Sequence, residues 1–174
     1  MDHGVEEQGR ARLAPATYEQ FLGLCRQGTV VPVVKRVMAD MLTPVSAFLR
    51  IAGKQPYAFL LESVEGGEKV ARYSFLGARP HMVLRCRAGA VWIEENGVSR
   101  REELPPLDAM RRHAGRYVPV KVDDLPPFSG GAVGFMGYGA VRWFERLPDA
   151  HPDDVGVDDA VLAFFSTLVD FDHV

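Results

Sequence analysis

Residues 56–97, "PYAFLLESVEGGEKVARYSFLGARPHMVLRCRAGAVWIEENG", carry the strongest fold signal in the chain. The runs "PYAFLLESV" and "VARYSFLG" flank "EGGEK", a pattern that predicts a β-hairpin with a glycine-containing loop. "HMVLRCRAGAVWIEENG" predicts a second hairpin, in which Met82, Leu84 and Cys86 alternate with His81, Val83, Arg85 and Arg87. Because consecutive hairpins build antiparallel sheets, we expect an α+β fold, largely an antiparallel sheet with a few helices.

Three segments outside this block carry helical signals. In "ATYEQFLGLCRQG", residues 16–28, Thr17 and Gln20 have the spacing of a capping box. "PPLDAMRRHAGRY", residues 105–117, predicts a helix whose cations should form a solvated last turn: Arg111, Arg112, His113 and Arg116. "LTPVSAFLRIAGK", residues 42–54, predicts a helix that begins at Pro44, ends at Gly53 and buries an apolar stripe of Val45, Phe48, Leu49 and Ala52.

The glycine-rich segment "PPFSGGAVGFMGYG", residues 126–139, raises the question of a phosphate loop. A P-loop needs a lysine, and none follows Lys121; a dinucleotide fingerprint needs a third glycine where Arg142 stands. Apolar residues separate the glycines, so we expect a buried strand that packs closely against another backbone. Its structural glycines would be Gly130, Gly131, Gly134 and Gly137.

The remaining segments are an extended or edge strand at residues 30–40, a short helix at 139–147, an acidic loop at 147–159 and a buried strand at 160–174. A core strand at the end of the sequence either joins this domain's sheet or precedes further chain. The acidic loop contains "HPDD", residues 151–154, but it lacks the order of a calcium loop. We therefore expect no metal site and, from the residues alone, no catalytic constellation.

Composition narrows the class of protein. The 174 residues are 47% hydrophobic and 25% charged, as in a globular domain, and the net charge of −3 argues against nucleic-acid binding. Cys25 and Cys86 are too few for a disulfide framework and are expected to be small buried residues in a reducing compartment. With no signal-peptide pattern and no apolar run long enough for a membrane span, we expect a cytoplasmic protein with a disordered leader at residues 1–14.

Polar residues in the first hairpin raise the possibility of a binding site. Strand alternation places Leu61 and Ser63 on one face. If the loop holds an even number of residues, Ser63 lies opposite Arg72 and Leu61 opposite Ser74. Glu62 would then reach a ligand from the edge or end of the strand. The alternative is a half-exposed hairpin with an Arg–Glu surface pair.

Three segments together resemble the N-terminal region of anthranilate synthase component I, a chorismate-utilising enzyme. They are "LTPVSAFLRI", "FLLESVEGGEKVARYSFLG" and "PPFSGGAVGFMGYGAVRWFERLP", in this order and at these distances. The resemblance runs from about Thr17 onward; aminodeoxychorismate synthase is the nearest related family, and the isochorismate and salicylate synthases are more distant. Gly139 departs from the pattern, because family members often carry an acidic residue there.

The resemblance implies a regulatory domain at residues 15–174, without the catalytic C-terminal domain. Enzymes of this family are lyases that make anthranilate and pyruvate from chorismate in tryptophan biosynthesis, with ammonia from a glutamine amidotransferase subunit. Their chorismate- and magnesium-binding residues lie in the C-terminal domain. The resemblance therefore implies that this chain alone holds no cofactor and is inactive, and that magnesium serves the full-length enzyme.

The resemblance also implies a ligand, because the LLES segment of this family lines the feedback site for tryptophan. Carried over residue by residue, the effector-binding residues are Leu61, Glu62, Ser63, Arg72 and Ser74. Tryptophan suits this set of residues: it has an indole ring to bury, an ammonium group that Glu62 can bind and a carboxylate that Arg72 can bind. The alternatives are the matching domain of aminodeoxychorismate synthase and a non-catalytic amino-acid-binding module.

Overall fold

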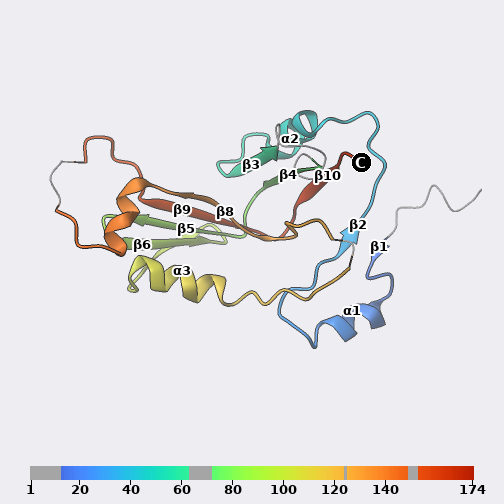
Figure 1. The fold of residues 1–174 in the computed structure, drawn as a ribbon, viewed down its shortest axis with the longest axis horizontal. Coiled ribbons are helices and arrows are strands. Elements are labelled where there is room, and N and C mark those ends of the chain that lie inside the picture. The colour runs from blue at the N-terminus through green and yellow to red at the C-terminus, as the bar shows by residue number, and fades with distance from the viewer. Residues whose placement is uncertain (1–12, 63–71, 124, 149–152) are drawn as a thin grey trace, which may run out of the picture. The chain divides into compact units, whose positions relative to one another are not determined.

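The computed structural model describes residues 13–62, 72–123, 125–148 and 153–174, and its fold is α+β with largely antiparallel sheets (Figure 1). Its helices are α1 Tyr18–Leu24, α2 Pro44–Ala52, α3 Pro106–Ala114 and the 3-10 helix η1 Tyr138–Trp143. The chain divides into two compact units, residues 1–43 with 117–125 and residues 44–116 with 126–174. The fold class expected from the two hairpins is confirmed.

The first unit contains α1 and a small antiparallel pair of strands, β1 Leu13–Ala14 and β2 Val34–Lys35. The capping box of α1 is confirmed. The Thr17 hydroxyl accepts a hydrogen bond from the Gln20 amide at 3.3 Å, and the Gln20 side chain accepts one from the Thr17 amide at 3.3 Å. Of the expected leader, residues 1–12 lie outside the described residues, and the last two residues form β1.

The second unit contains a five-stranded antiparallel sheet in the order β7-β6-β5-β9-β8. Its bounds are β5 Met82–Arg87, β6 Ala90–Glu95, β7 Val98–Glu102, β8 Gly131–Met136 and β9 Ala160–Phe165. The β5–β6 hairpin is confirmed. Ala88–Gly89 and Asn96–Gly97 connect β5, β6 and β7, and all four residues have the positive φ that two-residue hairpin turns require. Strand β7 did not figure among the sequence predictions.

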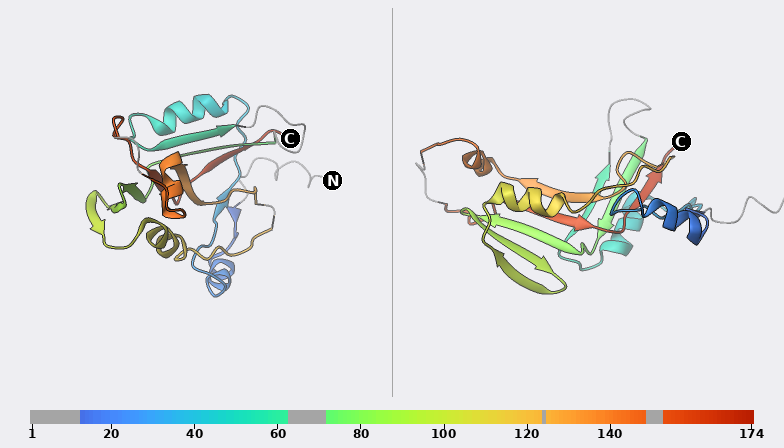
Figure 2. Two further views of the ribbon diagram at one scale, coloured as in Figure 1. Left: turned by 60° about the vertical axis from the view of Figure 1, so that its left-hand side comes forward. Right: turned by 90° about the horizontal axis from the view of Figure 1, so that it is seen from below.

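The expected alternation in β5 produces the main core. Met82, Leu84 and Cys86 are buried. Across the pairing they meet residues of β6 and β9, including Ile93 opposite Leu84 and Val91 opposite Cys86. Helix α3 packs against β6, with Ala109 and His113 wholly buried (Figure 2).

The prediction of a solvated last turn in α3 is therefore wrong for His113. Its neighbours Arg111 and Arg112 are exposed, but His113 faces the sheet. Its Nε2 lies 3.2 Å from a carboxylate oxygen of Glu102, the last residue of β7. Arg112 and Arg100 reach the same carboxylate at 3.3 and 3.4 Å. One partly buried carboxylate thus joins α3 to the edge of the sheet.

A three-stranded antiparallel sheet, β10-β4-β3, completes the second unit. Its strands are β3 Ala58–Glu62, β4 Tyr73–Ala78 and β10 Val169–Asp172, and α2 lies along one of its faces (Figure 2). The predicted stripe of α2 is partly wrong, because Val45 and Leu49 are exposed while Ala47 and Ala52 are buried. The short alanine side chains let the helix approach the sheet closely. The face of α2 that is buried is therefore rotated about the helix axis relative to the predicted stripe.

The run at residues 160–174 forms two strands instead of one. Strand β9 lies between β5 and β8 in the larger sheet, as the apolar pattern predicted. After a short connection, β10 pairs with β4 in the smaller sheet. A second apolar cluster joins the sheets, with Val83 and Phe165 packed against Tyr57 and Phe59.

The glycine-rich segment forms β8, an edge strand and not the buried strand that was expected, since most of its residues are exposed. Close backbone approach is nevertheless present at Gly134, where an added Cβ would overlap the carbonyl oxygen of Val161 in β9. Gly130 and Gly131 have φ of 151° and 129°, and a Cβ added at Gly137 would lie only 3.3 Å from the Asp159 carbonyl oxygen. All four glycines thus have a backbone reason.

The two cysteines differ in environment, although both were expected to be buried. Cys25 ends α1, which buries none of its residues, and is exposed, whereas Cys86 is wholly buried. Burial raises the pKa of the Cys86 thiol to about 11, with a further contribution from Asp159.

We expect a thiol reagent at pH 8 to modify Cys25 rapidly and Cys86 only after unfolding, because the reactive species is the thiolate. Mass spectrometry should show a single adduct under native conditions and two adducts in denaturant. A Cys25→Ser variant provides the control, since it should show no rapid modification. Rapid native labelling of that variant would contradict the buried position of Cys86.

Candidate functional site

The ends of three strands meet at one edge of the smaller sheet. Strand β3 ends at Glu62, β4 begins at Tyr73 and β10 ends at Asp172. Because both pairings with β4 are antiparallel, the final residues of β3 and β10 lie beside the first residues of β4. Charged and polar side chains from all three strand ends therefore gather there: Glu62, Arg72, Ser74, Asp172 and His173.

The predicted β3–β4 hairpin is confirmed, but its predicted register is wrong by one residue. Glu62 lies opposite Ser74 and Leu61 opposite Phe75. An odd number of residues separates Glu62 from Ser74, whereas the prediction assumed that the loop holds an even number of residues. Since a one-residue shift reverses the faces, Glu62 shares a face with Ser74, and Leu61 lies on the other face, half-exposed. Ser63 lies outside the described residues.

Ser74 links the polar side chains of this edge. Only 3% of the residue is exposed. Its hydroxyl oxygen lies 2.8 Å from Nε2 of His173, a hydrogen-bond distance, and 3.5 Å from Oε1 of Glu62, a longer contact. A covered hydroxyl in this position holds its neighbours in place, whereas Glu62 and His173 are exposed and remain accessible to a ligand.

Among the described residues, Arg72 is paired with Asp172 and not with Glu62. Its Nε and Nη2 donate hydrogen bonds to the two Asp172 oxygens at 2.8 and 2.6 Å. These bonds lower the pKa of Asp172 and raise that of Arg72. The guanidinium carbon also lies 4.9 Å from the centre of the Tyr73 ring.

Aromatic rings lie next to Arg72, on the face of β4 opposite to Ser74 and Glu62. The Tyr73 and Phe75 rings are stacked with centroids 5.9 Å apart, and Phe128 meets Phe75 edge-on at 5.6 Å. Carboxylate, guanidinium and aromatic surface are the three elements that recognise an aromatic amino acid. Among the described residues, no group of His, Cys, Asp or Glu side chains could hold a metal ion, and none of the helices has the length and apolarity to cross a bilayer.

Two residues of this edge, Asp172 and His173, were missed by the sequence reasoning. They lie about a hundred positions after their partners, with Asp172 separated from Arg72 by 100 residues. The sequence does contain one indication of these residues, because the polar segment "DFDH", residues 170–173, interrupts a mainly apolar run. Its meaning depends on the pairing of β10 with β4, which local sequence does not specify.

Comparison with known proteins identifies relatives of the chain. No family model matches the chain. Anthranilate synthase component 1 of Acetivibrio thermocellus is 36% identical over 91% of this chain and 32% of its own length. The protein of the same name from Synechocystis is 39% identical over 90% of this chain and 31% of its own length. The chain is homologous to a part of anthranilate synthase component 1.

The fold supports this relationship. A crystal structure of anthranilate synthase component I from Streptococcus pneumoniae aligns with a TM-score of 0.51 and 26% identity, covering 80% of this chain and 29% of that one. The chain spans about a third of the length of the anthranilate synthase component 1 relatives that it matches. The family resemblance and the fold class expected from the sequence are both confirmed.

Proposed function

We propose that this chain is the N-terminal regulatory part of an anthranilate synthase component 1. Its identity of 36–39% to proteins of that name, over about nine-tenths of its length, carries the proposal. The whole enzyme would make anthranilate and pyruvate from chorismate and ammonia. The names of these relatives favour this assignment over aminodeoxychorismate synthase and over a free amino-acid-binding module.

The proposed role of this chain is to bind tryptophan as a feedback inhibitor at the edge formed by β3, β4 and β10. The Glu62 carboxylate would bind the ammonium group, and Arg72 would bind the carboxylate. The aromatic surface that includes Tyr73 lies beside Arg72 and suits an indole ring, but it is on the opposite face of β4 from Glu62, so the ligand would have to reach around the strand end to contact both. Ser74 would act through Glu62 and His173, because its own hydroxyl is covered. Leu61 and Ser63 remain proposed members of the site.

Catalysis is proposed to lie outside this chain. Its described residues offer no group for magnesium, so the metal and chorismate would bind in the part of a longer protein that corresponds to the remainder of the relatives. Ammonia would come from a glutamine amidotransferase subunit. The chain alone should therefore form no anthranilate from chorismate, magnesium and ammonium, measured by anthranilate fluorescence; clear turnover would contradict this division of roles.

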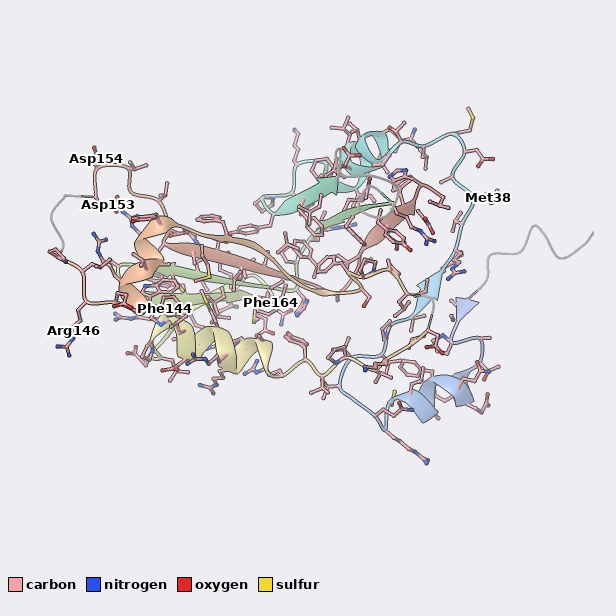
Figure 3. The ribbon with its side chains drawn as sticks, in the orientation of Figure 1. Met38, Phe144, Arg146, Asp153, Asp154 and Phe164 are labelled. Atoms are coloured by element: carbon pink, nitrogen blue, oxygen red, sulfur yellow. The ribbon has the colours of Figure 1, made fainter. Side chains whose placement is uncertain are left out.

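The exposed apolar side chains of β8 and η1 are the surface that we propose for the catalytic domain. Phe144 extends from the end of η1 (Figure 3). Aromatic and methionine side chains at this exposure are typical of protein interfaces. The other large apolar members are Phe135, Met136, Tyr138 and Leu147.

Calorimetric titration with tryptophan tests the proposed effector site. We expect weak but measurable binding to the chain, and at least a tenfold weaker affinity in Glu62→Gln, equivalent to about 1.4 kcal/mol. The reason is that the neutral amide keeps the side-chain shape but loses the charge that attracts the ammonium group. Glu145→Gln, an exposed carboxylate beside η1, is the matched control and should bind normally. Equal affinities in all three proteins would move the site elsewhere.

A further inference from the structure

The Arg72–Asp172 ion pair engages the cation that a bound amino acid would need for its carboxylate. Both Asp172 oxygens accept hydrogen bonds from Arg72, at 2.8 and 2.6 Å. This is the bidentate geometry by which arginine also binds a free carboxylate. Asp172 occupies the Nε–Nη2 edge of the guanidinium, so a ligand carboxylate bound through the same edge would have to displace it.

The pair is placed where such an exchange is feasible. The side chains of Arg72 and Asp172 are 43% and 38% exposed, so solvent and solutes reach both. Exposed ion pairs contribute little to stability, because water screens the charges. Breaking the Arg72–Asp172 pair would therefore reduce the binding free energy of a ligand only slightly.

Each partner also keeps other contacts when the pair opens. The Arg72 guanidinium lies against the Tyr73 ring, which would hold it near the strand end. Asp172 accepts a second hydrogen bond, from the Val174 amide at 3.3 Å, and this contact does not involve Arg72. The two side chains are thus positioned independently, and separating them leaves neither without an interaction.

We propose that Asp172 is an internal competitor that occupies Arg72 in the ligand-free protein and is displaced by the carboxylate of the bound amino acid. The proposal rests on the proposed function, since it concerns the same site. Asp172 thereby sets the affinity of the site and lowers it below what Arg72 alone would give. A ligand that carries a carboxylate must replace Asp172 as the partner of Arg72 in order to bind. A ligand without a carboxylate does not compete with Asp172.

Asp172→Asn is the direct test, because the amide has nearly the same shape but no charge. Tryptophan should bind the variant about two- to fivefold more tightly, the change that corresponds to losing up to about 1 kcal/mol of competition. Tryptamine, which has the indole and the ammonium but no carboxylate, should bind both proteins with affinities within twofold. Calorimetric titrations with the two ligands on the same preparations measure both effects.

Two further variants separate this local effect from others. Asp154→Asn removes the same charge from an exposed loop beyond η1, at the other end of the five-stranded sheet (Figure 3), and should leave tryptophan binding unchanged. Arg72→Lys in the Asp172→Asn background should lose the gain, because lysine lacks the bidentate geometry. Thermal unfolding of each variant shows whether it is folded.

The outcomes distinguish this proposal from the proposed function. If tryptophan binds the wild-type chain but Asp172→Asn binds it equally or more weakly, Asp172 is not a competitor and the inference is overturned. Equal tightening of tryptophan and tryptamine, or the same gain in Asp154→Asn, would also overturn it. If tryptophan binds none of the proteins, the proposed effector site fails, and the inference fails with it.

Discussion

Gly134→Ala should lower the free energy of unfolding by about 3 kcal/mol, the largest stability effect that we expect. An alanine Cβ at this position overlaps the carbonyl oxygen of Val161 and approaches the carbonyl carbon at 2.8 Å. Overpacking ordinarily costs about 1–3 kcal/mol, and the upper end applies here because the obstacle is backbone, which no rotamer change can move away. The strand must instead separate from β9, to which β8 is paired.

Thermal and chemical unfolding of the purified chain measure this effect. The midpoint temperature should fall by roughly 6–12 °C, given about 2–4 °C per kcal/mol for chains of this size. Gly23→Ala in α1 is the matched control, since a Cβ there meets nothing within 4 Å and alanine favours helices. If the two variants unfold at the same temperature, β8 does not approach β9 as closely as described.

Glu102→Ala should produce the second largest loss, about 2 kcal/mol. The carboxylate is 11% exposed and accepts hydrogen bonds from His113, Arg112 and Arg100. Removing it leaves the imidazole of His113 buried without this partner, and its Nδ1 has no hydrogen-bond partner among the described residues. Leaving a buried polar group unsatisfied costs about 1–3 kcal/mol.

The loss should depend on pH in a defined direction. The hydrogen bond with His113, followed by the hydrogen bond from Arg100 and the positive charges of Arg112 and Arg100, lowers the pKa of Glu102 in the folded state. A carboxylate with a lowered folded pKa stabilises the protein above its unfolded pKa, about 4.3, and this contribution disappears as pH falls through the folded value. The stability difference between wild type and Glu102→Ala should therefore be full at pH 6–7 and shrink progressively below about pH 4.

Glu103→Gln is the matched control for that experiment. Its side chain is the next carboxylate along the chain, is 85% exposed and, among the described residues, forms an ion pair only with Arg101, at 3.8 Å. Such an exposed pair contributes at most about 1 kcal/mol, so the substitution should change stability little at any pH. A similar loss in both variants would show that general charge balance, and not the buried contact with His113, determines the effect.

Local sequence was sufficient for the features that depend on local physics. The alternation correctly placed Met82, Leu84 and Cys86 in the core, but Val83 on the alternate face is buried as well, in the second apolar cluster. The spacing of Thr17 and Gln20 predicted the helix cap, and the apolar run at residues 160–174 predicted a core strand, whose first part forms β9. In each case neighbouring residues determine the periodicity or the hydrogen bonds.

The errors arose where distant pairing decides the structure. The register of β3 and β4 depends on how the intervening loop closes, and sequence alone does not fix whether the residue count is odd or even. Strand β7, "VSRRE", is too polar to be recognised and exists because an Asn-Gly turn returns the chain along β6. His113 of α3 contacts Glu102, which belongs to β7 and not to the helix. Strand β10 brings Asp172 to Arg72 from 100 residues away.

The division of residues 160–174 between two sheets has a consequence for how the protein is made. On the ribosome, β4 and β5 emerge early, but each has one neighbour that is encoded some 75 to 100 positions later. Until β9 and β10 are synthesised, both early strands present an open edge with unpaired backbone groups, the kind of surface that invites wrong partners. Closing both sheets therefore depends on residues 160–172, which are translated long after β4 and β5.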